Sequence, residues 1–106
     1  MKTTKVVTPI VEGINRRFFV AIEALVSLGR ISSLEGFCKL HGFSPPRYRE
    51  TRQSYGITPN PNSKPSRYKQ IELEALHSLC NNYNISSEWL LLGRGKMFKN
   101  EANRKI

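Results

Sequence analysis

The chain of 106 residues suits one domain with a single hydrophobic core, and a fold of this length needs no disulfide or metal to hold it together. Seventeen Lys and Arg residues face eight Glu residues and no Asp, which gives a formal net charge of +9 and predicts a polyanionic partner. The apolar runs are far shorter than the ~20 residues that cross a bilayer, and no secretion signal is recognisable, so we expect a cytoplasmic protein with no membrane partner.

The first elements expected along the chain are an extended arm and two helices. Residues 1–11 favour strand or coil and contain a proline, so they are expected to form an extended or disordered arm. Residues 12–28 repeat apolar side chains at helical spacing and stop before Gly29. Residues 33–41 predict a shorter amphipathic helix, which begins at one of two adjacent serines and ends at Gly42.

A third helix is expected over residues 45–55, with Ser44 as its N-cap and Pro45 in the first turn. Pro46 disfavours helical geometry at the residue before it, so a start one residue later is the alternative. Residues 56–66 contain three prolines, a glycine and two asparagines, and this composition predicts a loop.

Two helices are expected in the C-terminal half. Residues 67–83 have a broad apolar face, and Ser66 precedes them as a candidate N-cap. Residues 87–92 predict a short, very apolar helix that ends before a glycine, and residues 99–106 are expected to fray. The elements together predict an all-α domain over residues 12–98.

Charge is distributed unevenly along the chain. Residues 44–70 contain six Lys or Arg residues and one Glu, a sum of +5, whereas residues 71–92 contain three Glu and no Lys or Arg, a sum of −3. This division predicts a basic end that faces phosphate and an acidic, apolar end that faces the core or a partner.

Two segments carry a family resemblance. Residues 34–44, Leu-Glu-Gly-Phe-Cys-Lys-Leu-His-Gly-Phe-Ser, resemble the helix-turn-helix core of the lambda-repressor-like (Cro/repressor) family, in which a small residue precedes the turn glycine by four positions. Residues 83–98 are similar to the ending of many small prophage repressors of that family. The resemblance covers about residues 14–98, and it departs from the family at Pro45-Pro46 and in the long loop that follows the third helix.

The resemblance implies a five-helix, lambda-repressor-like domain that binds double-stranded DNA and regulates transcription, with the third helix in the major groove. The base contacts that it suggests are Pro46 to a thymine methyl, Arg47 to guanine and Glu50 to cytosine. The residues expected at phosphates are Ser33, Ser44, Arg49, Lys64, Arg67 and Lys69.

A homodimer is expected through the C-terminal half. Adjacent helical residues point about 100° apart, so a run of four large apolar residues cannot all face one core. The expected interface residues are Trp89, Leu91, Leu92, Met97 and Phe98. The alternative is that Met97 and Phe98 fold back over Trp89 and close the core of a monomer.

The same residues also bear on other functions. The double proline and the long loop favour a helix-turn-helix scaffold used for protein contact, as in an antitoxin or phage-control partner. Cys38, His41, His77 and Cys80 form mirrored pairs, but the spacing is not that of common zinc fingers, and the cysteines are expected to be reduced core thiols. No group is placed to orient a Cys/His nucleophile, so we expect neither an enzyme nor a cofactor.

Overall fold

The computed structural model describes residues 7–62 and 66–99. This part of the chain is all-helical, as the sequence predicts, and its only β-type pairing is an isolated bridge between Ile85 and Phe98. The elements in chain order are α1 (Pro9–Ser27), α2 (Leu34–His41), α3 (Pro45–Tyr55), α4 (Leu73–Asn82) and the π-helix η1 (Glu88–Leu92).

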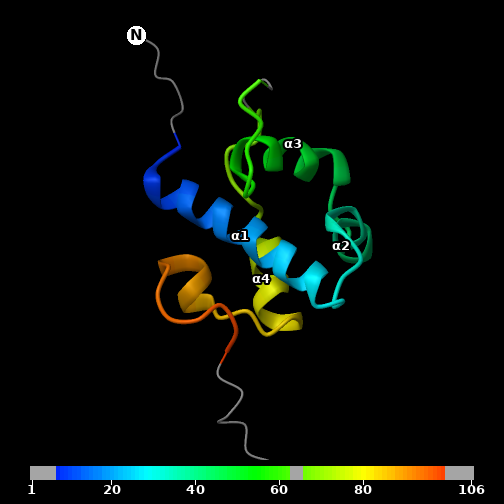
Figure 1. The fold of residues 1–106 in the computed structure, drawn as a ribbon, viewed down its shortest axis with the longest axis vertical. Coiled ribbons are helices and arrows are strands. Elements are labelled where there is room, and N and C mark those ends of the chain that lie inside the picture. Colours follow the sequence, from blue (N-terminus) through cyan, green and yellow to red (C-terminus); the bar gives the residue numbers. More distant parts are fainter. Residues whose placement is uncertain (1–6, 63–65, 100–106) are drawn as a thin grey trace, which may run out of the picture.

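The long helix α1 runs through the middle of the molecule, and the other elements are arranged around it (Figure 1). It begins at Pro9, so the prediction of an extended arm is wrong for residues 9–11, while residues 1–6 lie outside the described residues. Thr8 caps the helix, because its Oγ1 accepts a hydrogen bond from the backbone N–H of Val11 at 3.2 Å. Pro9 therefore opens the helix at its first position, where a missing N–H costs nothing, instead of interrupting an arm.

Helix α3 has the predicted bounds, and α2 begins one residue later than predicted, at Leu34. Local signals define the ends of both helices. Ser33 caps α2 by accepting a hydrogen bond from the backbone N–H of Gly36 at 2.9 Å. Gly42 ends α2 with a left-handed backbone (φ 81°), which residues with a side chain rarely adopt. Helix α3 begins at Pro45, and Ser44 precedes it in extended geometry without a capping hydrogen bond from its side chain.

The predicted start of the fourth helix is wrong: α4 begins at Leu73, and the preceding residues 66–72 form an irregular segment that we call the strap. Buried Asn15 of α1 holds the strap with both ends of its amide. Its Nδ2 donates to the carbonyl of Lys69 at 3.0 Å, and its Oδ1 accepts from the backbone N–H of Ile71 at 3.2 Å. These tertiary hydrogen bonds satisfy backbone groups that a helix would otherwise pair.

The core between α1, α2 and α3 is rich in aromatic rings. Phe37 of α2 is fully buried, and its ring centroid lies 6.0 Å from those of Phe18, Phe43 and Tyr83. His41 lies 4.9 Å from the same ring. Phe37 thus joins residues from most of the chain into one cluster.

The C-terminal segment folds back on the turn before η1. The backbone N–H of Ser86 donates to the carbonyl of Met97 at 2.7 Å, and that of Lys99 donates to the carbonyl of Asn84 at 3.0 Å. Arg17 of α1 holds the C-terminal part of η1, because its guanidinium donates a hydrogen bond to the carbonyl of Leu90 at 2.8 Å. The short fifth helix that the sequence predicts is therefore present, as a π-helix held at both ends.

None of the helices within residues 7–62 and 66–99 is both long enough and apolar enough to cross a membrane.

Candidate nucleic-acid interface

Helix α3 has one exposed side and one buried side. Pro46, Arg49 and Gln53 are exposed and recur three and four positions apart, so they form a single stripe. On the opposite side, Tyr48 and Thr51 are almost completely buried, at 1% and 2% exposure. The stripe therefore faces solvent along the outer edge of the molecule, where α3 lies in Figure 1.

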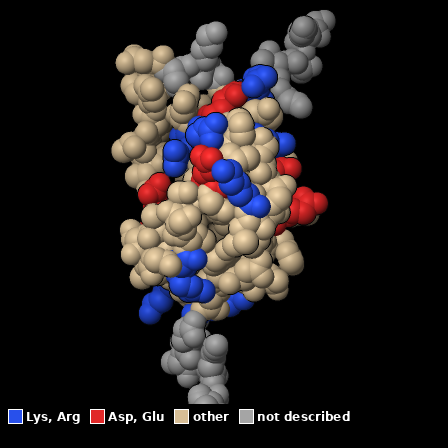
Figure 2. All heavy atoms as spheres, turned by 90° about the vertical axis from the view of Figure 1, so that its right-hand side faces the viewer, with Lys and Arg blue, Asp and Glu red and all other residues tan. Residues whose placement is uncertain are grey.

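Three arginines of α3 pair with glutamates of neighbouring elements. The shortest N–O distances are 3.7 Å for Arg47–Glu72, 3.5 Å for Arg49–Glu35 and 3.9 Å for Arg52–Glu23. Figure 2 shows the resulting surface, on which Lys and Arg side chains alternate with Glu side chains over the upper part of the face. Ion pairs this exposed contribute about 0–1 kcal/mol, so a phosphate group can take the place of the carboxylate.

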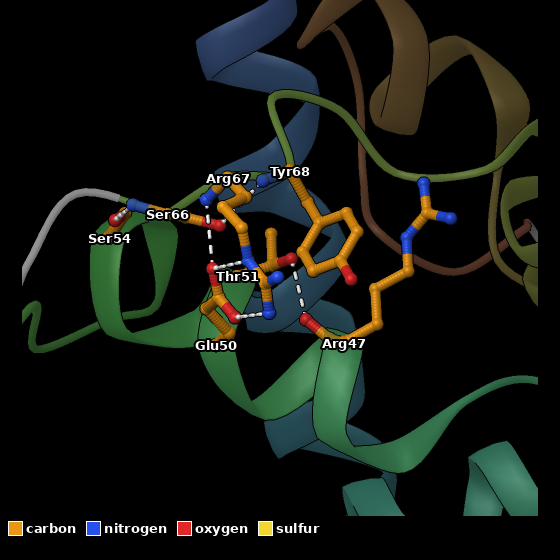
Figure 3. A network of polar contacts seen from close by, with 7 residues as sticks. All are labelled: Arg47, Glu50, Thr51, Ser54, Ser66, Arg67 and Tyr68. Carbon is orange, nitrogen blue, oxygen red and sulfur yellow. Dashed lines mark hydrogen bonds and ion pairs between the residues drawn. The ribbon is translucent and has the colours of Figure 1, made fainter.

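The N-terminal end of the strap is hydrogen-bonded to α3 (Figure 3). Glu50 Oε2 accepts from the backbone N–H of Arg67 at 2.8 Å and from its Nε at 3.3 Å, and Oε1 accepts from Nη2 at 3.1 Å. Ser54 Oγ accepts from the backbone N–H of Ser66 at 3.1 Å. The hydrogen bonds from Arg67 lower the pKa of Glu50, so this carboxylate stays ionised at neutral pH.

Arg47 lies on the flank of α3 that faces the strap. Its guanidinium lies 4.6 Å from the ring centroid of Tyr68, and that of Arg67 lies 5.4 Å from the same ring, on the side that faces Glu50 in Figure 3. Together with Lys69, these residues line an open hollow of about 380 Å³ between the strap and the start of α1. One flank of α3 thus gathers three cations.

The predicted base contacts fall in different places. Pro46 lies on the exposed stripe, Glu50 is bonded to Arg67, and Arg47 is turned toward Tyr68. Sequence reasoning missed Gln53, which shares the stripe with Pro46 and carries an amide suited to an adenine edge. Helical spacing offered a signal, because Tyr48 and Tyr55 lie about two turns apart on the side of the helix opposite to this stripe.

The predicted phosphate contacts that the structure describes lie on α3, at the start of α2 and α3, and on the strap. Arg49 lies on the stripe, and Arg67 and Lys69 lie on the strap beside it. Ser33 is occupied as the cap of α2, and Ser44 is exposed at the turn. Lys64 lies outside the described residues.

The predicted dimer residues divide into exposed and packed ones. Leu91 and Leu92 are 42% and 60% exposed, whereas Trp89, Met97 and Phe98 are half-buried against the core. The sequence analysis missed Ile10, which is 72% exposed. It lines an open groove of about 350 Å³ together with Pro9, Gly13, Arg17, Leu91 and Leu92.

The end opposite α3 is not purely acidic and apolar. The segment that follows η1 lies at the lower end of the described molecule in Figure 1, and its Arg94, Lys96 and Lys99 are exposed. The sum of −3 was taken over residues 71–92 and therefore left these three cations out. The basic side chains of the described residues are thus not confined to one end of the molecule.

The two cysteines and two histidines do not form a cluster. No group of three or more His, Cys, Asp or Glu residues within the described ranges is arranged to hold a metal ion. His41 Nε2 instead lies 2.8 Å from the hydroxyl of Tyr83. Burial raises the pKa of Cys38 to about 11, so this thiol is protonated and unreactive at neutral pH.

Comparison of the chain with protein-family models, with curated proteins and with solved structures finds no significant match. The geometry of α2, α3 and the strap is therefore what indicates the function of this protein.

Proposed function

We propose that this protein binds double-stranded DNA through α2, α3 and the strap, as a lambda-repressor-like helix-turn-helix domain, and regulates transcription in the cytoplasm. The observation that carries the proposal is the exposed stripe of α3, which has arginines on both flanks and follows a three-residue turn from α2. A helix of this kind can enter the major groove, where its flanks meet the two phosphate backbones.

The stripe and the flanks would have different tasks. Arg49 and Gln53 have the side chains that pair bidentately with guanine and adenine in the major groove, and Pro46 offers apolar contact to a thymine methyl. Arg52 on one flank, and Arg47 and Lys69 on the other, would contact phosphates and position the helix without reading sequence, and Arg67 beside them would contact a phosphate as well.

We expect duplex binding to weaken steeply with salt. If four to six cations of residues 44–70 displace counterions, log K falls with log salt at a slope of about −4 to −5. Electrophoretic mobility shifts across a salt series measure this slope, and Lys96→Ala, at the opposite end of the molecule, serves as a control that leaves it unchanged. A protein that binds no duplex at low salt, or binds independently of salt, contradicts the proposal.

The two kinds of contact can be separated by mutation. Gln53→Ala is expected to weaken a selected site by about 1–3 kcal/mol and to relax the choice at one base pair. Arg47→Ala is the comparison, because this residue lies on the flank and its loss should weaken all duplexes to a similar degree. Competition binding with single-base variants distinguishes the two, and the reverse pattern would restore Arg47 as the base-reading residue.

We also propose that the protein is a homodimer, with the exposed apolar surface of Ile10, Leu91 and Leu92 at the interface. A two-fold dimer would set two α3 helices about 34 Å apart, the length of one DNA turn. Sedimentation equilibrium is expected to show a dimer at micromolar concentration that Leu91→Glu converts to a monomer. A wild type that stays monomeric at high micromolar concentration removes the dimer from the proposal.

A protein-binding scaffold is the second candidate. The observation that favours it is the mixed charge around α3, where the glutamates at 23, 35, 50 and 72 neutralise arginines in the free protein. A surface of alternating charge suits a protein partner better than a purely basic one does. Binding across the salt series decides between the two, since only a polyanion gives the steep slope.

A further inference from the structure

Glu50 and Arg67 form an ion pair in the free protein, although the sequence suggests a DNA contact for each of them. The bonds between them are of two separable kinds. The backbone N–H of Arg67 holds Glu50 Oε2 at 2.8 Å, whereas the guanidinium engages Oε2 at 3.3 Å and Oε1 at 3.1 Å. If the guanidinium leaves, the backbone bond still orients the carboxylate, and Oε1 becomes free to accept another donor (Figure 3).

The two partners differ in how firmly they are held. The side chain of Arg67 is 77% exposed, and that of Glu50 is 27% exposed on α3. An ion pair with so exposed a cation is weak and is readily replaced by a competing anion. The strap itself need not move, because Asn15 and Ser54 bind its backbone independently of the guanidinium.

We propose that Glu50 and Arg67 form an exchange pair that couples the reading of a base to a phosphate contact; this inference rests on the proposed DNA-binding function. When Glu50 Oε1 meets a base amino group in the major groove, Arg67 moves from Glu50 to a neighbouring phosphate. Cytosine N4 and adenine N6 are the amino donors there. Opposite guanine or thymine, whose facing groups are acceptors, Glu50 keeps Arg67 and the phosphate contact is not made.

The exchange makes salt dependence a property of the DNA sequence. One phosphate contact contributes about 0.9 to the slope of log K against log salt. A duplex with the correct base therefore shows a slope steeper by about one unit than a duplex without it. An ordinary phosphate contact, in contrast, contributes equally to both duplexes.

The test uses two probes: a duplex recovered by selecting random-sequence DNA on the wild-type protein, and the same duplex with its sequence shuffled. For the wild type, the slope is expected to be steeper by about one unit on the selected duplex. Arg67→Ala is expected to abolish this difference by flattening only the selected slope. Glu50→Gln, which frees Arg67 permanently, is expected to steepen the shuffled slope to the selected value.

Two controls accompany these variants. Lys96→Ala removes one positive charge far from α3 and is expected to preserve the difference between the probes. The thermal unfolding of each variant is measured as well, to check that the variant keeps the wild-type fold. If Arg67→Ala flattens both slopes equally or neither slope, the exchange is overturned. A selection that enriches no sequence also overturns the exchange. In that case, salt-dependent binding of the shuffled duplex would still support the proposed DNA-binding function. If the protein binds no duplex at all, both the exchange and the proposed function are wrong.

Discussion

Phe37→Ala is expected to lower the free energy of unfolding by about 3–5 kcal/mol. The side chain is fully buried, and its ring packs against rings from α1, from the α2–α3 turn and from Tyr83. Its removal leaves a cavity where three parts of the chain meet, and rigid neighbouring rings fill such a space poorly. Urea denaturation followed by far-ultraviolet circular dichroism measures the loss.

Leu40→Ala is the matched control for this experiment. Leu40 lies on the same short helix but is 72% exposed, so its truncation is expected to change stability by no more than about 0.5 kcal/mol. Equal losses for the two variants would mean that α2 does not pack on α1 as described.

Asn15→Leu is expected to lower stability by about 2–4 kcal/mol, although leucine is of broadly similar size. The change removes both hydrogen bonds to the strap and leaves the buried N–H of Ile71 without a partner, which alone costs about 1–3 kcal/mol. The local signature is faster hydrogen exchange at the Ile71 amide. Asn81→Ala, at an exposed position on α4, is the control. Unchanged exchange at Ile71 would show that the strap is held by other contacts.

Sequence reasoning located α2 and α3 because their boundaries are set locally. A serine cap, a glycine in left-handed geometry and a proline at the first helical position lie within a few residues of the ends that they define. The same kind of signal was misread at Pro9, which suits both a broken arm and a helix start. Only the cap at Thr8 decides between these two interpretations.

The strap could not be predicted in the same way. Its sequence resembles the first turns of a helix, and the reason that it is not one lies more than fifty residues earlier, at Asn15. The pairing of Glu50 with Arg67 depends on the irregular backbone of the strap, so it could not be predicted from the sequence either. The stripe of α3 follows from helical periodicity, but Gln53 carries no charge and so does not stand out among the arginines of this helix.

The contact between Arg17 and the end of η1 bears on how the protein is made. It joins residues 73 positions apart, so a growing chain on the ribosome contains α1 long before the carbonyl that Arg17 binds has been synthesised. Until Leu90 emerges, the side of α1 that it covers stays open to water and to other chains. Contacts between such distant residues form late and slow the closing of a domain. We therefore expect the packing of η1 against α1 to be a late step in the folding of this domain.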